Sequence, residues 1–400
     1  MKVLSPETLR FIQEHRFDEV RTLALQAKKY PLVDMAEAVQ QIAGRQIAEK
    51  KLPEWGSTDG LLYPGHLSME QCSSEQTACY KASLVRGASF VDLTAGLGVD
   101  CAYMARHFEQ VDYVERQQVL CEIATHNFPL LGVGHIRVHH VDGIEFLKQM
   151  SPVDCLFLDP ARRDKNGGKT VAITDCEPDV CALEPLLVEK GKMVLVKLSP
   201  MLDIASALRD LSYIQEIHVI SLQNECKELL LVLRKETSCA EGVRVYCEQL
   251  FTNAPSQHFD FTYGEEREAD CLLAEQVESY LYEPGAALLK ASPFRLLAQA
   301  YGVRKLHANS HLYTSSGLVD FPGRCFKVVA VSGFGKKELK SFLQGIDKAN
   351  ITVRNFPSTV AELRKKLKLK EGGEVYLFAT TLGGGEKVLI HCRKTGVDEQ

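Results

Sequence analysis

The stretch that decides the fold is Ser89-Phe90-Val91-Asp92-Leu93-Thr94-Ala95-Gly96-Leu97-Gly98-Val99-Asp100. An apolar run meets an acidic residue, a glycine-rich turn follows, and the start of a helix comes next. This order is typical of the first strand, turn and helix of a doubly wound α/β domain, where the turn forms part of a cofactor site. Glycines at such a turn let the backbone approach a ligand closely because they carry no Cβ atom.

The chain around this stretch, from Ala88 to about Arg234, alternates between strand and helix patterns. The first five expected strands are separated by segments long enough for a crossover helix, which predicts parallel pairing. The last two are joined only by the short polar link 223–227, so this pair must be antiparallel. A mostly parallel sheet ending in an antiparallel hairpin is not the usual sheet of a dinucleotide-dependent dehydrogenase. The expected strands are 89–93, 111–115, 136–139, 154–158, 192–198, 216–222 and 227–234.

The 400 residues exceed what one core usually serves, and the pattern divides them into four regions. Residues 1–65 show apolar side chains at helical spacing and are predicted to be helical. Residues 66–238 contain the α/β sheet, and its entry helix is expected to start at a capping box of Ser73 and Gln76. Residues 239–322 form a linking region, and residues 323–400 follow a β-α-β-α-β-β order that predicts a small separate module.

The composition is that of a soluble globular protein, with 45% hydrophobic and 25% charged residues. No apolar run is long enough to span a bilayer, and the first residues do not have the pattern of a signal peptide. The thirteen cysteines are scattered singly, which predicts reduced thiols in a cytoplasmic protein. The histidines show no metal-binding spacing, so no metal site is expected.

Charge is distributed unevenly along the chain. Residues 321–400 contain 15 Lys and Arg against 8 Asp and Glu, a net charge of +7, whereas the whole chain carries −5. The remaining residues therefore carry −12. This asymmetry indicates a basic C-terminal module on an acidic body. A solvated helix face over Arg364–Lys370 would give the same pattern, so the two explanations stay open.

Two acidic residues accompany the glycine-rich turn. Glu115 ends the second expected strand, close to the position where a ribose-binding carboxylate follows the turn. It is suited to accept hydrogens from the hydroxyls of any adenosine cofactor, although a plain surface charge at a strand end is the alternative. Asp92 is suited to meet the charged amine of a methionine moiety, directly or through water.

A third acidic residue, Asp142, precedes Gly143 after the third expected strand. It can accept a hydrogen from an adenine amino group. It can also cap the following helix, and the two roles are compatible.

The sequence Asp159-Pro160-Ala161-Arg162 follows a buried strand, at the edge where open α/β sheets bind ligands. Asp159 and neighbouring carbonyl groups can accept hydrogens from a nitrogen and turn its lone pair toward an electrophilic methyl group. Such a displacement depends on positioning and electrostatics. A capped turn with arginines in solvent is the alternative.

Several other chemistries lack their sequence patterns. There is no phosphate-binding Gly-x-x-x-x-Gly-Lys and no Gly-x-Ser-x-Gly elbow. The strand end 194–200 has no cysteine, although a covalent mechanism on a pyrimidine carbon would need a nearby thiolate.

These residues together resemble the class I S-adenosylmethionine (SAM) methyltransferases. More closely, the chain resembles a bacterial methyltransferase family with a ferredoxin-like segment and a C-terminal THUMP-like domain. The segments that carry the resemblance are 70–82, 92–100, 159–163, 282–286, 350–356, 363–367 and 372–373.

The resemblance implies a Rossmann-like seven-stranded sheet, a SAM site in the Asp92–Gly98 loop, a catalytic strand end at Asp159–Arg162, and a C-terminal module that presents RNA. Nitrogen-directed nucleic-acid methyltransferases commonly have an aromatic residue after the Asp-Pro-Pro core, whereas here Ala161 and Arg162 follow. A guanidinium plane can also stack on a base. The expected catalytic residues are Asp159, Pro160 and Arg162, and the expected cofactor-binding residues are Asp92, Thr94, Ala95, Gly96, Gly98, Asp100, Glu115, Asp142 and Gly143.

The leading hypothesis is therefore a SAM-dependent methyltransferase that acts on an exocyclic nitrogen of an RNA base, guanine N2 first and adenine N6 second. In this hypothesis Arg162 or Arg163 stacks on the base or holds phosphate. The alternatives are an N-methyltransferase acting on a protein or small molecule, and an RNA-binding protein that keeps the fold without catalysis.

Overall fold

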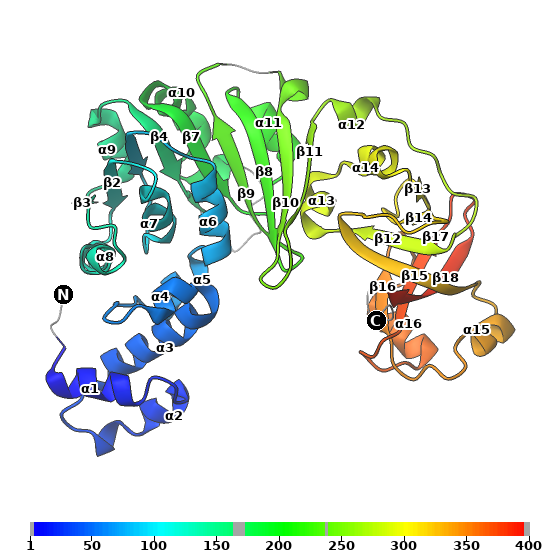
Figure 1. Ribbon diagram of the computed structural model, residues 1–400, viewed down its shortest axis with the longest axis horizontal. Coiled ribbons are helices and arrows are strands. Elements are labelled where there is room, and N and C mark those ends of the chain that lie inside the picture. Colours follow the sequence, from blue (N-terminus) through cyan, green and yellow to red (C-terminus); the bar gives the residue numbers. More distant parts are fainter. Residues whose placement is uncertain (1–3, 163–172, 237–238, 396–400) are drawn as a thin grey trace. The chain divides into compact units, whose positions relative to one another are not determined.

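The computed structural model describes residues 4–162, 173–236 and 239–395, and its chain divides into two compact units (Figure 1). The first unit comprises Met1–Ile217 and Glu228–Cys239, and the second comprises His218–Lys227 and Ala240–Gln400. None of the helices in the described ranges is long and apolar enough to cross a membrane. Each of the thirteen cysteines, all within those ranges, is a free thiol.

The first unit begins with helices, blue in Figure 1, as the apolar spacing predicts. Ser5 caps the first helix as expected, because its Oγ accepts a hydrogen bond from the N–H of Thr8 at 3.1 Å. Phe11, Leu23 and Ile42 form part of a small buried core among these helices. The helices are α1 (Pro6–Glu14), α2 (Val20–Leu25), α3 (Met35–Lys51), α4 (Pro53–Ser57), α5 (His66–Gln71) and α6 (Glu75–Ser83), with a 3₁₀ turn, η1, at Ala27–Lys29.

The expected capping box of α6 is wrong by one residue. The Oγ of Ser74, and not that of Ser73, accepts a hydrogen bond from the N–H of Thr77. The hydroxyl of Ser73 instead donates to the carboxylate of Asp100 at 2.7 Å. A buried carboxylate is a stronger acceptor than solvent, so it takes the hydroxyl that local sequence assigned to the cap.

All seven expected strands are present within one or two residues of their predicted bounds. β1 pairs in parallel with β2 and β4, β2 with β3, and β4 with β7, which confirms the parallel prediction. β9 lies between β7 and β8 in the sheet and is antiparallel to β7. The strands are β1 (Ser89–Asp92), β2 (Gln110–Glu115), β3 (Ile136–His140), β4 (Val153–Leu158), β7 (Gly191–Leu198), β8 (Ile214–Leu222) and β9 (Glu225–Leu233).

The connections between the parallel strands contain the expected helices. A separate short ladder, β5 (Ala161–Arg162) with β6 (Cys176–Glu177), follows the Asp-Pro corner, and η2 (Ile173–Asp175) precedes β6. The helices are α7 (Val99–Ala105), α8 (Gln118–Leu130), α9 (Gly143–Gln149), α10 (Val180–Lys190) and α11 (Ile204–Asp210).

The hairpin of β8 and β9 turns on two residues, Gln223 and Asn224, both in the left-handed region with φ of 52° and 62°. Two such residues form the turn whose twist matches that of the strands. Two further strands, β10 (Arg244–Leu250) and β11 (Gln257–Thr262), follow the 3₁₀ turn η3 (Ala240–Gly242) and extend the predicted sheet. Its hydrogen-bonded order is β11-β10-β8-β9-β7-β4-β1-β2-β3.

The second unit contains a seven-stranded sheet in the order β13-β14-β12-β15-β18-β17-β16. Its last part has the predicted β-α-β-α-β-β order. The elements of the unit are α12 (Glu265–Glu268), β12 (Tyr280–Pro284), α13 (Ala286–Ala291), α14 (Phe294–Tyr301), β13 (Arg304–Lys305), β14 (Tyr313–Ser315), β15 (Gly323–Ser332), α15 (Lys336–Phe342), β16 (Asn350–Val353), α16 (Val360–Leu367), β17 (Tyr376–Thr381) and β18 (Lys387–Lys394).

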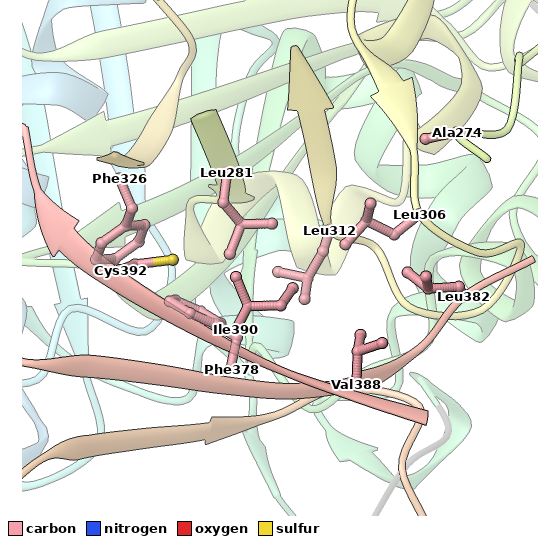
Figure 2. Close-up of a cluster of buried hydrophobic side chains, with 10 residues drawn as sticks. All are labelled: Ala274, Leu281, Leu306, Leu312, Phe326, Phe378, Leu382, Val388, Ile390 and Cys392. Carbon is pink, nitrogen blue, oxygen red and sulfur yellow. The ribbon is translucent and has the colours of Figure 1, made fainter. Parts of the chain in front are cut away.

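At β17 this sheet is covered on both faces, since alternate residues of that strand enter different clusters. Phe378 joins a cluster with Leu281, Phe326 and Ile390 (Figure 2), whereas its neighbour Leu377 packs with residues of α15 and α16. β12 pairs with β15, so the predicted regions 239–322 and 323–400 share one sheet.

Candidate functional site

An open pocket lies at the carboxyl ends of β1, β2 and β4 in the first unit. Its cavity has a volume of about 190 Å³ and is open to solvent on one side. Five residues singled out from the sequence line it together: Thr94, Glu115, Asp142, Gly143 and Asp159. Open α/β sheets bind their ligands at this edge.

The glycine-rich turn is held against the second strand. Gly96 and Gly98 both have left-handed backbones, with φ of 55° and 84°. The N–H of Gly96 donates to Glu115 Oε2 at 2.9 Å, and the hydroxyl of Tyr113 donates to the carbonyl of Gly96. The N–H of Ala95 donates to the carbonyl of Val114 at 3.0 Å. The turn is therefore fixed before any ligand binds.

The two glycines are expected to respond differently to alanine. A Cβ at Gly96 meets no atom within 4 Å, so Gly96→Ala should cost about 1–2 kcal/mol for the left-handed backbone alone. A Cβ at Gly98 lies 2.9 Å from the ring of Phe128, so Gly98→Ala should cost a further 1–3 kcal/mol or so for overpacking. Urea unfolding followed by the fluorescence of Trp55, the single tryptophan, measures both. Equal losses would contradict this account of the turn.

Glu115 is buried and its carboxylate is oriented from both sides. Besides the N–H of Gly96, it accepts the N–H of Gln117, which donates to Oε1 at 2.8 Å. Each carboxylate oxygen can accept more than one hydrogen bond, so Glu115 keeps acceptor capacity toward the pocket that it lines.

Asp92 is buried, and only one of its two carboxylate oxygens accepts a hydrogen bond from the described residues. Its Oδ1 accepts the N–H of Thr94 at 3.1 Å, whereas its Oδ2 has no hydrogen-bond partner among the described residues. Burial raises the pKa of Asp92 well above its usual range. Asp92 is not among the residues that line the pocket, whereas the two residues that follow it, Leu93 and Thr94, are. A buried acceptor without a donor, so near a pocket in the sequence, fits a ligand that supplies a cationic group.

Asp142 caps α9, because its Oδ1 accepts the N–H groups of Ile144 and Glu145 at 2.9 and 3.3 Å. The capping role weighed from the sequence is confirmed. Gly143 begins this helix so close to β1 that an added Cβ would lie 2.2 Å from the carbonyl oxygen of Leu93. Only glycine allows the helix start to approach the strand end in this way.

The Asp-Pro corner is fixed to the glycine-rich turn. The N–H of Asp159 donates to Thr94 Oγ1 at 2.6 Å, and Pro160 is buried. The Asp159 side chain is 38% exposed, and its Oδ2 lies 2.5 Å from Lys197 Nζ. Arg162 pairs with Cys176 in β5, whereas Arg163 lies outside the described residues.

Asp100 does not line the pocket. It belongs to a buried cluster with Lys81, Lys197 and Ser73, and its carboxylate oxygens lie 3.1 Å from Lys81 Nζ and 3.3 Å from Lys197 Nζ. Burial raises the pKa of Asp100, but the two lysines outweigh burial and lower this pKa to about 2. Lys81 is fully buried and also lies 2.6 Å from Glu228 Oε1.

Three members of this cluster, Lys81, Lys197 and Glu228, were not predicted from the sequence. The available signal was a single charged residue inside or beside an otherwise apolar strand: Lys197 in 194–198, and Glu228 before 229–233. Lys81 and Glu228 are 147 residues apart, so no local pattern joins them.

The pocket lining combines hydrogen-bond acceptors with apolar surface, which suits an adenosine group. Glu115 and Asp142 present carboxylates, and Ile144, Leu147 and Leu187 present apolar surface for a base. The unfilled Oδ2 of Asp92 suits an ammonium group. In the described part of the chain, no three or more His, Cys, Asp or Glu side chains come together in a way that could hold a metal ion.

Comparisons with known proteins agree with this geometry. Residues 280–322 match a family model described as a ferredoxin-like domain, and residues 323–394 match one described as THUMP domain-like. No curated protein matches the chain.

A solved structure aligns with nearly the whole chain. It is described as a "putative methyltransferase" from Porphyromonas gingivalis W83, is 35% identical, covers 99% of this chain and 100% of its own, and has a TM-score of 0.88. Partial matches at a TM-score of 0.30 carry no argument about this chain. They include a Streptococcus mutans protein in complex with SAH (11% identity, 40% of this chain, 95% of its own) and an rRNA methylase from Streptococcus thermophilus (15%, 40% and 94%).

The full-length match extends across the α/β sheet, the pocket and both family-model regions. The chain therefore belongs to the bacterial methyltransferase-fold family that joins a Rossmann-like methyltransferase domain to a ferredoxin-like domain and a THUMP-like domain.

Proposed function

We propose that the protein is a SAM-dependent methyltransferase and that the pocket beside Gly96 binds the methyl donor. Glu115 accepts hydrogen bonds from the ribose hydroxyls, Asp142 from the adenine amino group, and Asp92 from the ammonium of the methionine moiety. The turn Thr94–Gly98 allows close approach of the backbone. The unpartnered, buried Oδ2 of Asp92 is the observation that carries this proposal, because a cationic ligand supplies the donor it lacks.

The proposed methyl acceptor is an exocyclic nitrogen of an RNA base, guanine N2 first and adenine N6 second. When bound, SAM supplies an electrophilic methyl group. Asp159 accepts a hydrogen bond from the target amino group, assisted by the carbonyl of Pro160, and so directs the nitrogen lone pair toward that methyl carbon. Arg162 stacks on the base or holds a phosphate.

The basic C-terminal region supports RNA as the partner. Helices α15 and α16 pack on the same core cluster, and lysines at their surfaces are exposed: Lys336, Lys337 and Lys340 on α15, with Lys365 and Lys366 on α16. Such a surface suits contact with a phosphate backbone. The match of residues 323–394 to a THUMP domain-like model agrees with this role.

These lysines offer a test that leaves the sheet intact. Replacing Lys336, Lys337, Lys365 and Lys366 by alanine should weaken RNA binding. The slope of log K against log salt concentration should become shallower by about one for each phosphate contact that is lost. Affinity for S-adenosylhomocysteine should not change. Filter binding over a salt series and calorimetry measure the two quantities. An unchanged salt slope would exclude these helices as the RNA-binding surface.

Transfer of a labelled methyl group to unmodified total RNA tests the proposed function. Mass spectrometry of the nucleosides then identifies the modified base. Transfer to protein or to small molecules without transfer to RNA would support the alternative enzyme. RNA binding without donor affinity would support a non-catalytic binding protein.

A further inference from the structure

Five charged side chains form a continuous chain from the interior of the first unit to the pocket. Glu228 lies 2.6 Å from Lys81, Lys81 lies 3.1 Å from Asp100, Asp100 lies 3.3 Å from Lys197, and Lys197 lies 2.5 Å from Asp159. Signs alternate along it, with three carboxylates and two ammonium groups.

Lys197 links the buried members of this series of ion pairs to Asp159, which lines the pocket. Its side chain is 12% exposed, whereas that of Asp159 is 38% exposed. Burial alone would lower the pKa of Lys197, but Asp159 and Asp100 outweigh burial and raise this pKa well above its usual range. Lys197 is therefore a cation throughout the working pH range, and Nζ is a fixed donor.

The Nζ of Lys197 is held independently of Asp159. It donates to Ser73 Oγ at 3.2 Å and to Asp100 Oδ2 at 3.3 Å, and Ser73 in turn donates to the same Asp100 oxygen. Asp159 is held at two points, its N–H by Thr94 and its Oδ2 by Lys197. The first contact fixes the backbone of Asp159 and the second fixes one oxygen of its carboxylate, so the side chain has little freedom to turn away from the pocket.

We propose that Lys197 is a positioning residue for methyl transfer, whose ammonium group holds the Asp159 carboxylate in the orientation that receives the amino group of the methyl acceptor. This role rests on the proposed function, and the ion pair with Lys197 is the contact that orients Asp159. Orientation before the reaction matters because a displacement of about 1 Å can lower a rate by about a hundredfold.

A double-mutant cycle tests the proposal with the full-length protein. Lys197→Gln should lower kcat for labelled methyl transfer by about 10–100-fold, with an unchanged KM for the donor and unchanged affinity for S-adenosylhomocysteine. Because Lys197 acts through Asp159, the double variant Lys197→Gln/Asp159→Asn should be no slower than Asp159→Asn alone. Lys197→Arg, which keeps the charge, should recover part of the rate. If Lys197→Gln does not fold, Lys197→Met, which also removes the ammonium group, takes its place in the cycle.

A matched control is available on the same strand. Lys192 also lies in β7 and pairs with a carboxylate, Asp154, at 2.7 Å, but it is 81% exposed and far along the strand from the pocket. Lys192→Gln should keep the wild-type kcat.

The outcomes distinguish a failure of the positioning role of Lys197 from a failure of the proposed methyl transfer to RNA. If Lys197→Gln keeps the wild-type kcat, or if the two substitutions multiply their effects, the positioning role is overturned, since Lys197 would then act only on Asp100 and the fold. If the wild-type protein transfers no methyl group to RNA, the proposed function fails, and this inference fails with it.

Discussion

Asp159→Asn is expected to lower the rate of methyl transfer by about 10²–10³-fold, the range found when one oriented hydrogen-bonding group is removed from a transition state. The amide places an NH₂ group where a carboxylate oxygen receives the target amino group, and it loses the ion pair with Lys197. The backbone N–H of residue 159 still reaches Thr94, so the corner should keep its shape. Rates at saturating donor and calorimetry with S-adenosylhomocysteine should show a loss in kcat with unchanged donor affinity.

The control for this substitution is Asp203→Asn. Asp203 follows β7 and caps α11 by accepting the N–H of Ser206 at 2.7 Å, a role that asparagine performs equally well. It should retain the wild-type rate. A wild-type rate in Asp159→Asn would remove Asp159 from the reaction.

Lys81→Met should have the largest effect on stability. It leaves Glu228 without the ammonium group 2.6 Å away, in a buried site, and removes one of the two cations beside Asp100. Breaking a buried ion pair from one side costs about 3–5 kcal/mol of unfolding free energy. Urea unfolding followed by Trp55 fluorescence reports on the first unit, to which both residues belong.

The pH dependence of this loss has a definite sign. The pKa of Asp100 is lowered to about 2 in the folded chain from an ordinary value of 3.8, so its contribution to stability is present above pH 4 and is lost as pH falls toward 2. The difference between wild type and Lys81→Met should therefore shrink over that range. Lys192→Met, at an exposed pair, should cost no more than about 1 kcal/mol at any pH. If Lys81→Met also cost no more than about 1 kcal/mol of unfolding free energy, the buried ion pairs of Lys81 would not stabilise the fold.

Much of the fold could be predicted from local sequence because its signals are local. Apolar runs and the short link at 223–227 were enough to predict the parallel strands and the closing hairpin. Five pocket residues were also found, since each follows a strand end and parallel strands place those ends at one edge.

The rest depends on contacts between distant parts of the chain. Lys81, Asp100, Lys197 and Glu228 come together only after the sheet has formed, and Ser73 leaves its expected cap to join them. Likewise, the pairing of β12 with β15 unites two regions that differ in local pattern. Asp100 was assigned to the cofactor from its place after the glycine-rich turn, and its side chain lies in this cluster.

Binding of S-adenosylhomocysteine tests the central claim most directly, by calorimetric titration together with a crystal structure of the protein soaked in the same compound. We expect one molecule per chain, with its ribose hydroxyls on Glu115 and its ammonium group on Asp92, and a clear loss of affinity in Glu115→Gln. A silent titration together with an empty pocket at the ends of β1 and β2 would contradict the account.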